Sequence, residues 1–173
     1  EYGGLGLPAK TYAKLVMQIS SVWMAITGIF NSHLMLALAI EKFGTPAQKM
    51  KWLPKLATGE VRGGLALTEP DAGTDLQGIR MVARADGDDY VINGTKQFIS
   101  GAGASAVYVV MARTADTGSR GITAILVPDG TPGLSFGPLE KKMGWHAQPT
   151  RQVILEDVRV PVAVARAEVP DHA

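Results

Sequence analysis

The chain has no cysteine among its 173 residues and almost no imbalance of charge. Without cysteine it forms no disulfide framework, no thiolate nucleophile and no Cys-ligated metal site. Its 17 Lys and Arg residues against 16 Asp and Glu leave a net charge of +1. That charge supplies no whole-molecule field to attract nucleic acid or an anionic membrane. We therefore expect no nucleic-acid partner.

Several catalytic motifs are also missing from the sequence. The three histidines, His33, His146 and His172, have no metal-ligand spacing between them, so no metal site is predicted. No Gly-x-Ser-x-Gly elbow supports a hydrolase, and no Gly-x-x-x-x-Gly-Lys-Ser/Thr loop supports a nucleotide triphosphatase. The stretch ISGAGAS (99–105) carries only two glycines of the dinucleotide-binding fingerprint. His33, inside an apolar run, is interpreted as a core residue with satisfied bonds.

The longest apolar run, residues 22–40, is broken at its centre by Asn31, Ser32 and His33. Hydrocarbon penalises polar groups most at this depth, so we expect core helices and no membrane insertion. The sequence starts at Glu1 and shows no signal-peptide pattern, which is typical of a fragment of a longer chain.

The first third of the chain is typical of helices. Thr45, Pro46 and Gln48 form a capping-box pattern that starts a helix, and the preceding Gly44 is suited to end the helix before it. Gly59 is suited to end the second helix. Pro54 lacks a backbone donor, so we expect it to kink or end that helix earlier.

Beyond residue 62 the pattern changes to short β-rich runs bounded by turns. The segment 86–89, Asp-Gly-Asp-Asp, predicts a hairpin between two of them. The expected fold class is α+β multidomain: a helical segment followed by an antiparallel β-barrel or sandwich. We assign residues 1–62 to a partial helical domain, 63–162 to the β domain and 163–173 to a divergent or truncated tail.

Two loops that follow predicted strands hold the candidate binding residues. In TEPDAGTD (68–75), successive backbone N–H groups form a concavity suited to a phosphate or a ring carbonyl. KQFISGAG (96–103) places an aromatic beside a hydroxyl, which suits a planar heterocycle. On local pattern alone, two ordinary glycine-rich turns explain the same residues.

Three longer stretches resemble signatures of the acyl-CoA dehydrogenase family, in the family's order: LALTEPDAGTD (65–75), NGTKQFISGAG (93–103) and QPTRQVILEDVRVP (148–161). EYGGLGLP (1–8) and FGTPAQKMKWLPKLATGE (43–60) are similar to its N-terminal helical domain. FISGAG and KKMGWHAQPTR (141–151) are most similar to isobutyryl-CoA dehydrogenase-like, short branched-chain members.

The resemblance implies FAD-dependent α,β-dehydrogenation of a short or branched acyl-CoA, with hydride transfer to flavin N5. It further implies electron-transfer flavoprotein as electron acceptor and a place in fatty-acid or branched-chain amino-acid catabolism. The implied cofactor-binding residues are Leu65, Leu67, Thr68, Gly73, Thr74, Phe98, Ile99 and Ser100. Among these, Phe98 packs on the flavin and the Ser100 hydroxyl faces N5. Thr74 and Ser119 are implied in substrate contact.

No catalytic residue is implied in this chain. The family's catalytic Glu belongs to a C-terminal four-helix domain that is absent from the sequence, and Glu69 is not at that position. A truncated, non-catalytic flavin- or CoA-binding module is therefore one alternative, and a related flavoprotein oxidase or monooxygenase is another. The family also implies a homodimer or homotetramer, cytoplasmic in a bacterium or in the mitochondrial matrix of a eukaryote.

Overall fold

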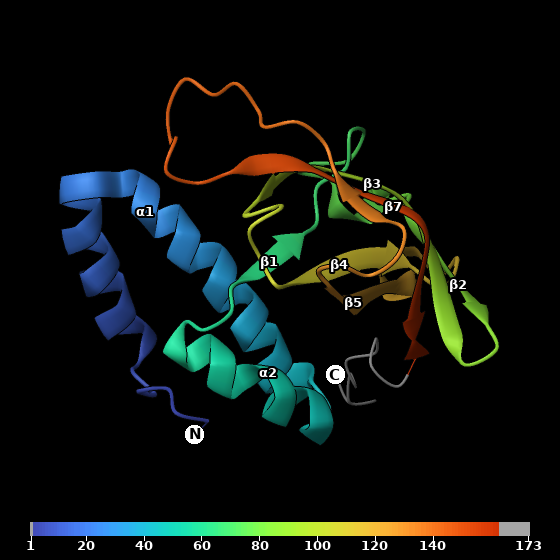
Figure 1. Cartoon of the computed structure of the whole chain (residues 1–173), viewed down its shortest axis with the longest axis horizontal. Helices are drawn as coiled ribbons and strands as arrows, with labels where there is room; N and C mark the ends of the chain where they lie inside the picture. The colour runs from blue at the N-terminus through green and yellow to red at the C-terminus, as the bar shows by residue number, and fades with distance from the viewer. Residues whose placement is uncertain (1, 163–173) are drawn as a thin grey trace.

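The computed structural model describes residues 2–162, in which two helices precede a curled sheet of seven strands (Figure 1). The tail assigned above to residues 163–173 lies outside the described residues. The elements are α1 (Ala9–Phe43), α2 (Pro46–Thr58), β1 (Gly63–Ala66), η1 (Leu76–Gly78), β2 (Val82–Asp86), β3 (Asp89–Ser100), β4 (Val107–Arg113), η2 (Gly118–Gly121), β5 (Ile122–Pro128), β6 (Leu134–Phe136) and β7 (Thr150–Pro161).

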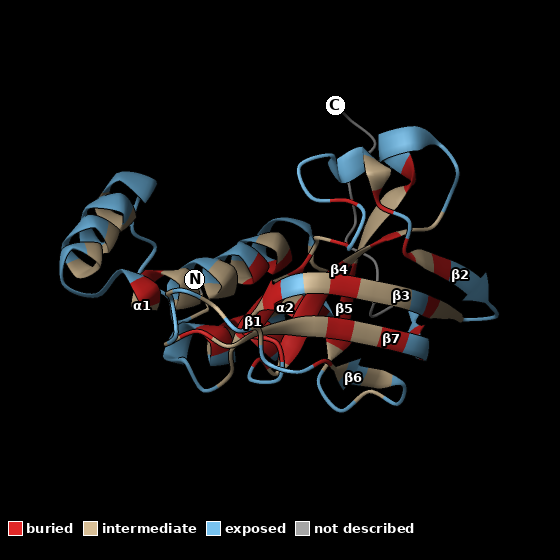
Figure 2. Ribbon diagram, turned by 90° about the horizontal axis from the view of Figure 1, so that it is seen from above, coloured by how far each residue is buried: buried red, intermediate tan, exposed pale blue. Residues whose placement is uncertain are grey.

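Helix α1 consists of two helical halves joined at Trp23, whose φ of −151° and ψ of 85° are not helical. The buried residues of α1, among them Leu36 and Ile40, all lie in its second half. The first half stands apart from the sheet and is mostly exposed (Figure 2). By length and composition alone α1 could cross a bilayer. His33 nevertheless bonds the Leu56 carbonyl and the Gly63 amide, so one face of the second half packs on the rest of the protein. The expectation of core helices holds for that face only, because Leu34 and Leu38 on the second half are 41% and 52% exposed.

Local signals predicted the ends of α2 correctly. The Thr45 hydroxyl accepts from the Gln48 amide, and the Gln48 side chain accepts from the Thr45 amide, which completes the capping box. Gly59 closes the helix in the left-handed conformation, with φ of 76°. Of the two outcomes expected at Pro54, a kink or the end of the helix, the second does not occur, because α2 continues to Thr58. A proline inside a helix removes one intrahelical bond, and the packing of Leu53 and Leu56 compensates for it.

The sheet has the order β1-β4-β2-β3-β7-β6, with β5 paired to β4. Strands β2 and β3 form the hairpin predicted at residues 86–89, and β3–β7, β4–β5 and β6–β7 are also antiparallel. Two pairings are parallel: β1 with β4, and β2 with β4 through Val82 and Arg113. The α+β class is confirmed, with a mixed sheet in the form of a half-barrel.

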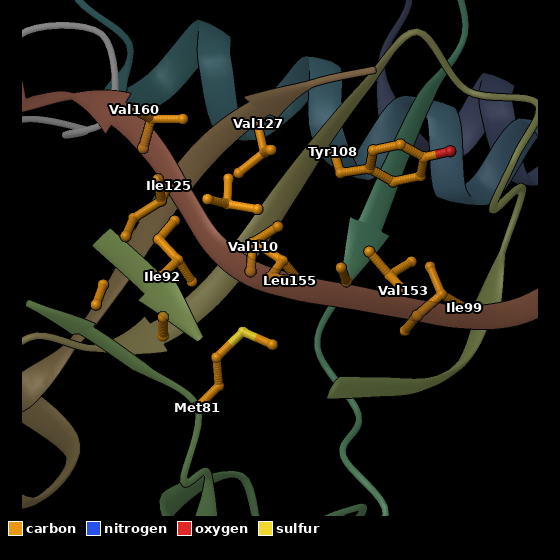
Figure 3. Close-up of a cluster of buried hydrophobic side chains, with 14 of the residues drawn as sticks. Met81, Ile92, Ile99, Tyr108, Val110, Ile125, Val127, Val153, Leu155 and Val160 are labelled. Atoms are coloured by element: carbon orange, nitrogen blue, oxygen red, sulfur yellow. The ribbon is translucent and has the colours of Figure 1, made fainter. Parts of the chain in front are cut away.

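Alternate residues of β4 serve two different cores. Val107 and Val109 face the helices and pack with Leu36, Leu53 and Leu56. The intervening residues Tyr108, Val110 and Ala112 face the inside of the curled sheet, where Ile92, Ile125 and Val153 meet them (Figure 3). Because side chains alternate along a strand, one strand couples the helical layer to the sheet interior.

The first half of α1 generates a prediction about association. Leu15 and Val22 are 45% and 89% exposed, and their spacing of seven residues places them on one helical face. We expect the isolated chain to self-associate through this apolar surface. The double substitution Leu15→Lys/Val22→Lys should raise the dissociation constant at least about tenfold, as measured by light scattering coupled to size exclusion.

Leu139→Lys is the matched control, because Leu139 is 55% exposed on a separate loop and should leave association unchanged. A wild-type chain that is monodisperse and monomeric at all concentrations would contradict the prediction.

Candidate functional site

The two loops identified in the sequence lie against each other in the fold. The Gln97 amide donates to the Thr68 carbonyl at 2.7 Å. One residue earlier, Lys96 Nζ donates to the Leu67 carbonyl at 3.0 Å. The segment that follows β1 and the last residues of β3 therefore run side by side. They lie about thirty positions apart in the sequence, and only the fold brings them together.

Phe98 has the most unusual backbone in this region. Its φ is 56°, in the left-handed region that non-glycine residues rarely adopt, and its side chain is 61% exposed. It lies within a register shift between Lys96 and Ile99 in the pairing of β3 with β7. A bulge of this kind re-aims a side chain at a cost of about 1–3 kcal/mol. A strained, solvent-exposed aromatic at such a point is typical of a ligand-binding residue.

The two loops carry three hydroxyls that are free to bind a ligand. Thr68, Thr74 and Ser100 make no side-chain hydrogen bond to any residue in the described range 2–162. Gly73 is exposed, and a Cβ placed there would meet nothing within 4 Å. The two loops therefore carry free hydroxyl groups and an open backbone position at Gly73.

Three of the predicted apolar residues have different surroundings. Ile99 is 3% exposed and points into the sheet interior (Figure 3), so only its backbone is available to a ligand. Leu65 packs with the helix-facing core, whereas Leu67 packs against the sheet interior. The structure therefore separates Leu65 from Leu67, although the two residues are close in sequence.

Ser119 lies in η2, which Arg113 ties to the far end of the first loop. The Arg113 guanidinium donates to the carbonyls of Ile79 at 3.2 Å, Gln77 at 2.9 Å and Gly118 at 2.9 Å. This places the exposed Ser119 next to η1, which begins two residues after Thr74, the other predicted substrate-contact residue. The substrate-contact candidates of the sequence thus lie on neighbouring loops.

Glu69 and Lys96 form a buried ion pair beneath these loops. Glu69 is 6% exposed, Lys96 is fully buried, and the distance from Nζ to Oε1 is 2.8 Å. Burial raises the pKa of Glu69, but the bonds from Lys96 and from the amides of Arg80 and Met81 together outweigh it. The pKa of Glu69 consequently lies below its ordinary value. Such a carboxylate is a poor proton acceptor, in agreement with its exclusion as the base.

The 142–148 loop is held together by the side chain of Lys142. Lys142 donates to the carbonyls of Trp145 at 2.9 Å and Gln148 at 2.5 Å, and to the Thr150 hydroxyl at 2.9 Å. His146 bonds the Lys142 carbonyl at 2.9 Å. The loop packs on α1 at Gly28, where a Cβ would lie 2.7 Å from the Trp145 ring.

Neither of the described histidines is placed as a catalytic base. The Gly63 amide donates to His33 Nδ1 at 3.4 Å, so Nε2 carries the proton that goes to the Leu56 carbonyl at 3.0 Å. This confirms His33 as a structural residue. Within residues 2–162 no three metal-ligating side chains gather, and His172 lies outside that range.

A large apolar cavity lies away from these loops. It measures about 470 Å³ and lies between the helices, lined by residues that include Tyr12, Leu34, Leu38 and Leu56. Its walls are apolar and carry few groups that fix a ligand. We place the candidate site at the two loops, where the free hydroxyls and the strained Phe98 lie. The groove between the helices is left out, because imperfect packing of two apolar helix surfaces is enough to produce it.

Comparison with known proteins agrees with the resemblance read from the sequence. Residues 64–158 match the family model of the acyl-CoA dehydrogenase middle domain, and residues 1–60 match that of the N-terminal domain. The chain belongs to the acyl-CoA dehydrogenase family. Its similarity extends through nearly all of the sequence, so the family assignment does not depend on one motif.

Individual members of the acyl-CoA dehydrogenase family and solved structures are similar over most of the chain. Mitochondrial isobutyryl-CoA dehydrogenase of Dictyostelium discoideum is 44% identical over 94% of the chain. The chain spans only 39% of that relative's length. An acyl-CoA dehydrogenase of Bacillus anthracis complexed with FAD superposes with a TM-score of 0.87 at 37% identity, covering 96% of the chain and 29% of that structure. A structure titled as the electron transferring flavoprotein of Acidaminococcus fermentans matches with a TM-score of 0.92 at 38% identity, covering 96% and 44%.

The sequence interpretation missed Lys96, although a signal was available. Ile92 and Lys96 stand at even spacing along β3, and Ile92 faces the sheet interior. Period-two alternation therefore places the lysine inward. A lysine that points inward requires a buried acceptor. Glu69, in the loop that follows β1, is the carboxylate that meets it.

A pH dependence follows from the buried carboxylate. Glu69→Gln removes the ion pair, and we expect a loss of roughly 3–5 kcal/mol at neutral pH. Because the folded-state pKa of Glu69 is lowered, its contribution is full above the unfolded-state pKa of about 4.3 and is lost as pH falls through the folded value. Urea unfolding from about pH 7 down to about pH 3 should show the wild-type advantage shrinking on the acid side. A constant difference over that range would contradict this assignment.

The close contact at Gly28 gives a second prediction. In an open helix, Gly→Ala stabilises by up to about 1 kcal/mol. Here the new methyl would meet the Trp145 ring and the buried Gln148 side chain, so Gly28→Ala should destabilise by roughly 1–3 kcal/mol in urea unfolding. Gly144→Ala, in the same loop with nothing within 4 Å, should have little effect. A stabilised Gly28→Ala variant would show that the loop does not pack on α1.

Proposed function

We propose that this chain is the N-terminal and middle-domain part of an FAD-dependent acyl-CoA dehydrogenase that acts on a short or branched acyl-CoA. The observation that supports it most is the Thr68–Gln97 contact, which brings the loop that carries Thr68 beside the segment of β3 that carries the strained, exposed Phe98. An aromatic face, ring-edge hydroxyls and open backbone are what a flavin requires of its protein. The likeness to a relative that is complexed with FAD supports the same cofactor.

Each side chain has a definite task in this proposal. Phe98 would pack on the flavin ring, the Thr68 hydroxyl would bond the ring edge and the Ser100 hydroxyl would donate toward N5. Gly73 and Thr74 would hold the pyrophosphate side through their backbone amides and the Thr74 hydroxyl. When bound, a flavin would supply a hydride acceptor for the substrate β-carbon. A hydroxyl placed in advance near the reduced ring stabilises the charge that develops there.

The chain's own carboxylates near the loops are not suited to take the substrate α-proton. Both oxygens of Glu69 accept hydrogen bonds, and its pKa is lowered. Asp75 accepts from the Gln77 amide at the start of η1, and Asp71 lies 3.8 Å from Arg80. The proposal therefore assigns the base to the part of the enzyme that corresponds to the family's C-terminal four-helix domain.

The partners and compartment follow from relatives. We propose acyl-CoA as the substrate and electron-transfer flavoprotein as the acceptor, in a homodimer or homotetramer. The likeness to a structure whose title names an electron transferring flavoprotein supports the acceptor. The mitochondrial isobutyryl-CoA dehydrogenase relative supports a short branched substrate.

The experiment is an anaerobic visible spectrum of the purified chain after addition of FAD and gel filtration, recorded before and after isobutyryl-CoA. Co-eluting flavin supports the cofactor site. Because the proposal assigns the base to a part of the enzyme outside these 173 residues, we expect the bound flavin not to bleach on addition of substrate. Bleaching would contradict that assignment, since it would show that this polypeptide supplies a base. A chain that retains no flavin contradicts the proposal for this polypeptide.

Substitutions test which residues hold the flavin. Phe98→Ala should weaken FAD binding by about 1–3 kcal/mol, the worth of a stacked aromatic, in a fluorescence-quenching titration. Leu139→Ala is a matched control, because Leu139 has a similar exposure of 55% against 61% for Phe98. Equal affinity in both variants would exclude Phe98 from the site.

A further inference from the structure

The buried pair of Glu69 and Lys96 has no task in the proposed chemistry. Lys96 has no exposed surface, and Glu69 is 6% exposed, so neither side chain reaches a ligand on the outer side of the loops. A buried ion pair is itself weak evidence for stability, because desolvation of the two charges offsets their attraction. Its position directly under both candidate loops therefore points to a role in shaping them.

Glu69 fastens the two ends of the first loop together. Its Oε2 accepts from the Arg80 amide at 2.7 Å, and its Oε1 accepts from the Met81 amide at 3.0 Å. Arg80 and Met81 come directly before β2, at the end of the excursion that starts at Glu69. The backbone of Glu69 also exchanges hydrogen bonds with that of Ala72, at 2.9 and 3.2 Å. One residue thus closes both a tight turn and the whole loop.

Lys96 fastens the closed loop to β3. Its ammonium donates to Glu69 Oε1 at 2.8 Å and to the Leu67 carbonyl at 3.0 Å. The next residue, Gln97, donates its amide to Thr68, and the bulge at Phe98 follows. The ammonium therefore bridges Leu67 and Glu69 at the start of the loop, and the bulge at Phe98 begins directly after Lys96 on β3. A change in its position would move Thr68 and Phe98 relative to each other.

We propose that Glu69 and Lys96 are positioning residues that hold the flavin-binding loop and the Phe98 bulge in their binding geometry before the cofactor arrives, an inference that rests on the proposed function. Binding to a pre-ordered site avoids the entropy of ordering two loops. Residues that contact a ligand keep an accurate geometry when buried neighbours fix their conformations by packing and hydrogen bonds. The pair acts through Thr68 and Phe98 and does not touch the cofactor.

Hydrogen exchange in the cofactor-free wild type tests whether the Glu69–Lys96 pair holds the two loops together, independently of cofactor binding. The amides of Arg80, Met81 and Gln97 should exchange slowly and with a common opening equilibrium, because one ion pair closes all three. The exposed amides of Gly73 and Thr74 should exchange much faster and serve as the internal comparison. Arg80 and Met81 amides that exchange as fast as those two would overturn the proposal, whatever the protein binds.

Substitution then links the fastening to the cofactor. Lys96→Met leaves a buried carboxylate without its ion partner and should weaken FAD binding at least about tenfold. Lys96→Met/Glu69→Gln leaves no buried charge, so it should melt close to wild type and still bind FAD about tenfold more weakly, with an altered visible spectrum of the bound flavin. The double variant keeps the test decisive if the single variant does not fold.

A control separates positioning from stability. Val160→Ala removes core volume at the far end of the sheet, beside Tyr90, and lowers the melting temperature without touching either loop. It should change FAD affinity less than about twofold. The proposal is wrong if Val160→Ala weakens FAD as much as Lys96→Met, or if the double variant binds like wild type. A wild-type chain that binds no FAD overturns the proposed function, and the exchange rates still decide whether the pair fastens the loops.

Discussion

The parallel pairing of β1 with β4 is the constraint on which the arrangement of this chain depends. Gly63 to Ala66 pair in register with Val107 to Val110, which inserts a four-residue strand between the helices and the sheet. Two adjacent glycines permit it. A Cβ on Gly63 would lie 2.5 Å from the Leu36 side chain, and one on Gly64 would lie 2.9 Å from the Tyr108 ring. Larger residues would push α1 away from the strand and the strand away from Tyr108.

The consequences of this pairing extend to the candidate site. Because β1 ends at Ala66, residues 67–69 lie beside the last residues of β3, where the Thr68 carbonyl accepts from the Gln97 amide. The loop then returns to β2 through the amides that Glu69 accepts. Helical packing, sheet topology and loop geometry therefore share one short strand. This explains why the residues of the proposed flavin site come from segments that are distant in sequence.

Predictions from sequence succeeded where the interaction is local. The capping box at Thr45, the left-handed Gly59 and the hairpin at residues 86–89 each depend on contacts within a few positions. Sequence alone did not decide between a kink and a helix end at Pro54, because the loss of one helical bond competes with tertiary packing that sequence spacing does not measure. The parallel pairings were not foreseen either, since they join strands that are tens of residues apart and leave no local signal.

The residues of the candidate site stay a prediction from the resemblance, and the structure adds how some of them are arranged. Resemblance named Thr68, Phe98 and Ser100, and the fold then showed the first two on adjoining segments with free or exposed side chains. The surroundings of Leu65 and Ile99 required the structure, because their burial is decided by which core each strand face meets. The Glu69–Lys96 pair could have been found from the alternation of β3. Its role in closing the loop could not, because the partner amides belong to residues eleven and twelve positions away.

The central claim is that residues 67–75 and 96–100 form one flavin site whose shape exists without the cofactor. A titration of the isotope-labelled chain with FAD, followed by amide and methyl NMR shifts, tests it most directly. The account predicts large shifts at Thr68, Gly73, Thr74, Phe98 and Ser100, with small ones for the buried Arg80 and Met81 amides. Shifts confined to the helix-lined cavity near Leu34 and Leu38, or absent at saturating FAD, would contradict it.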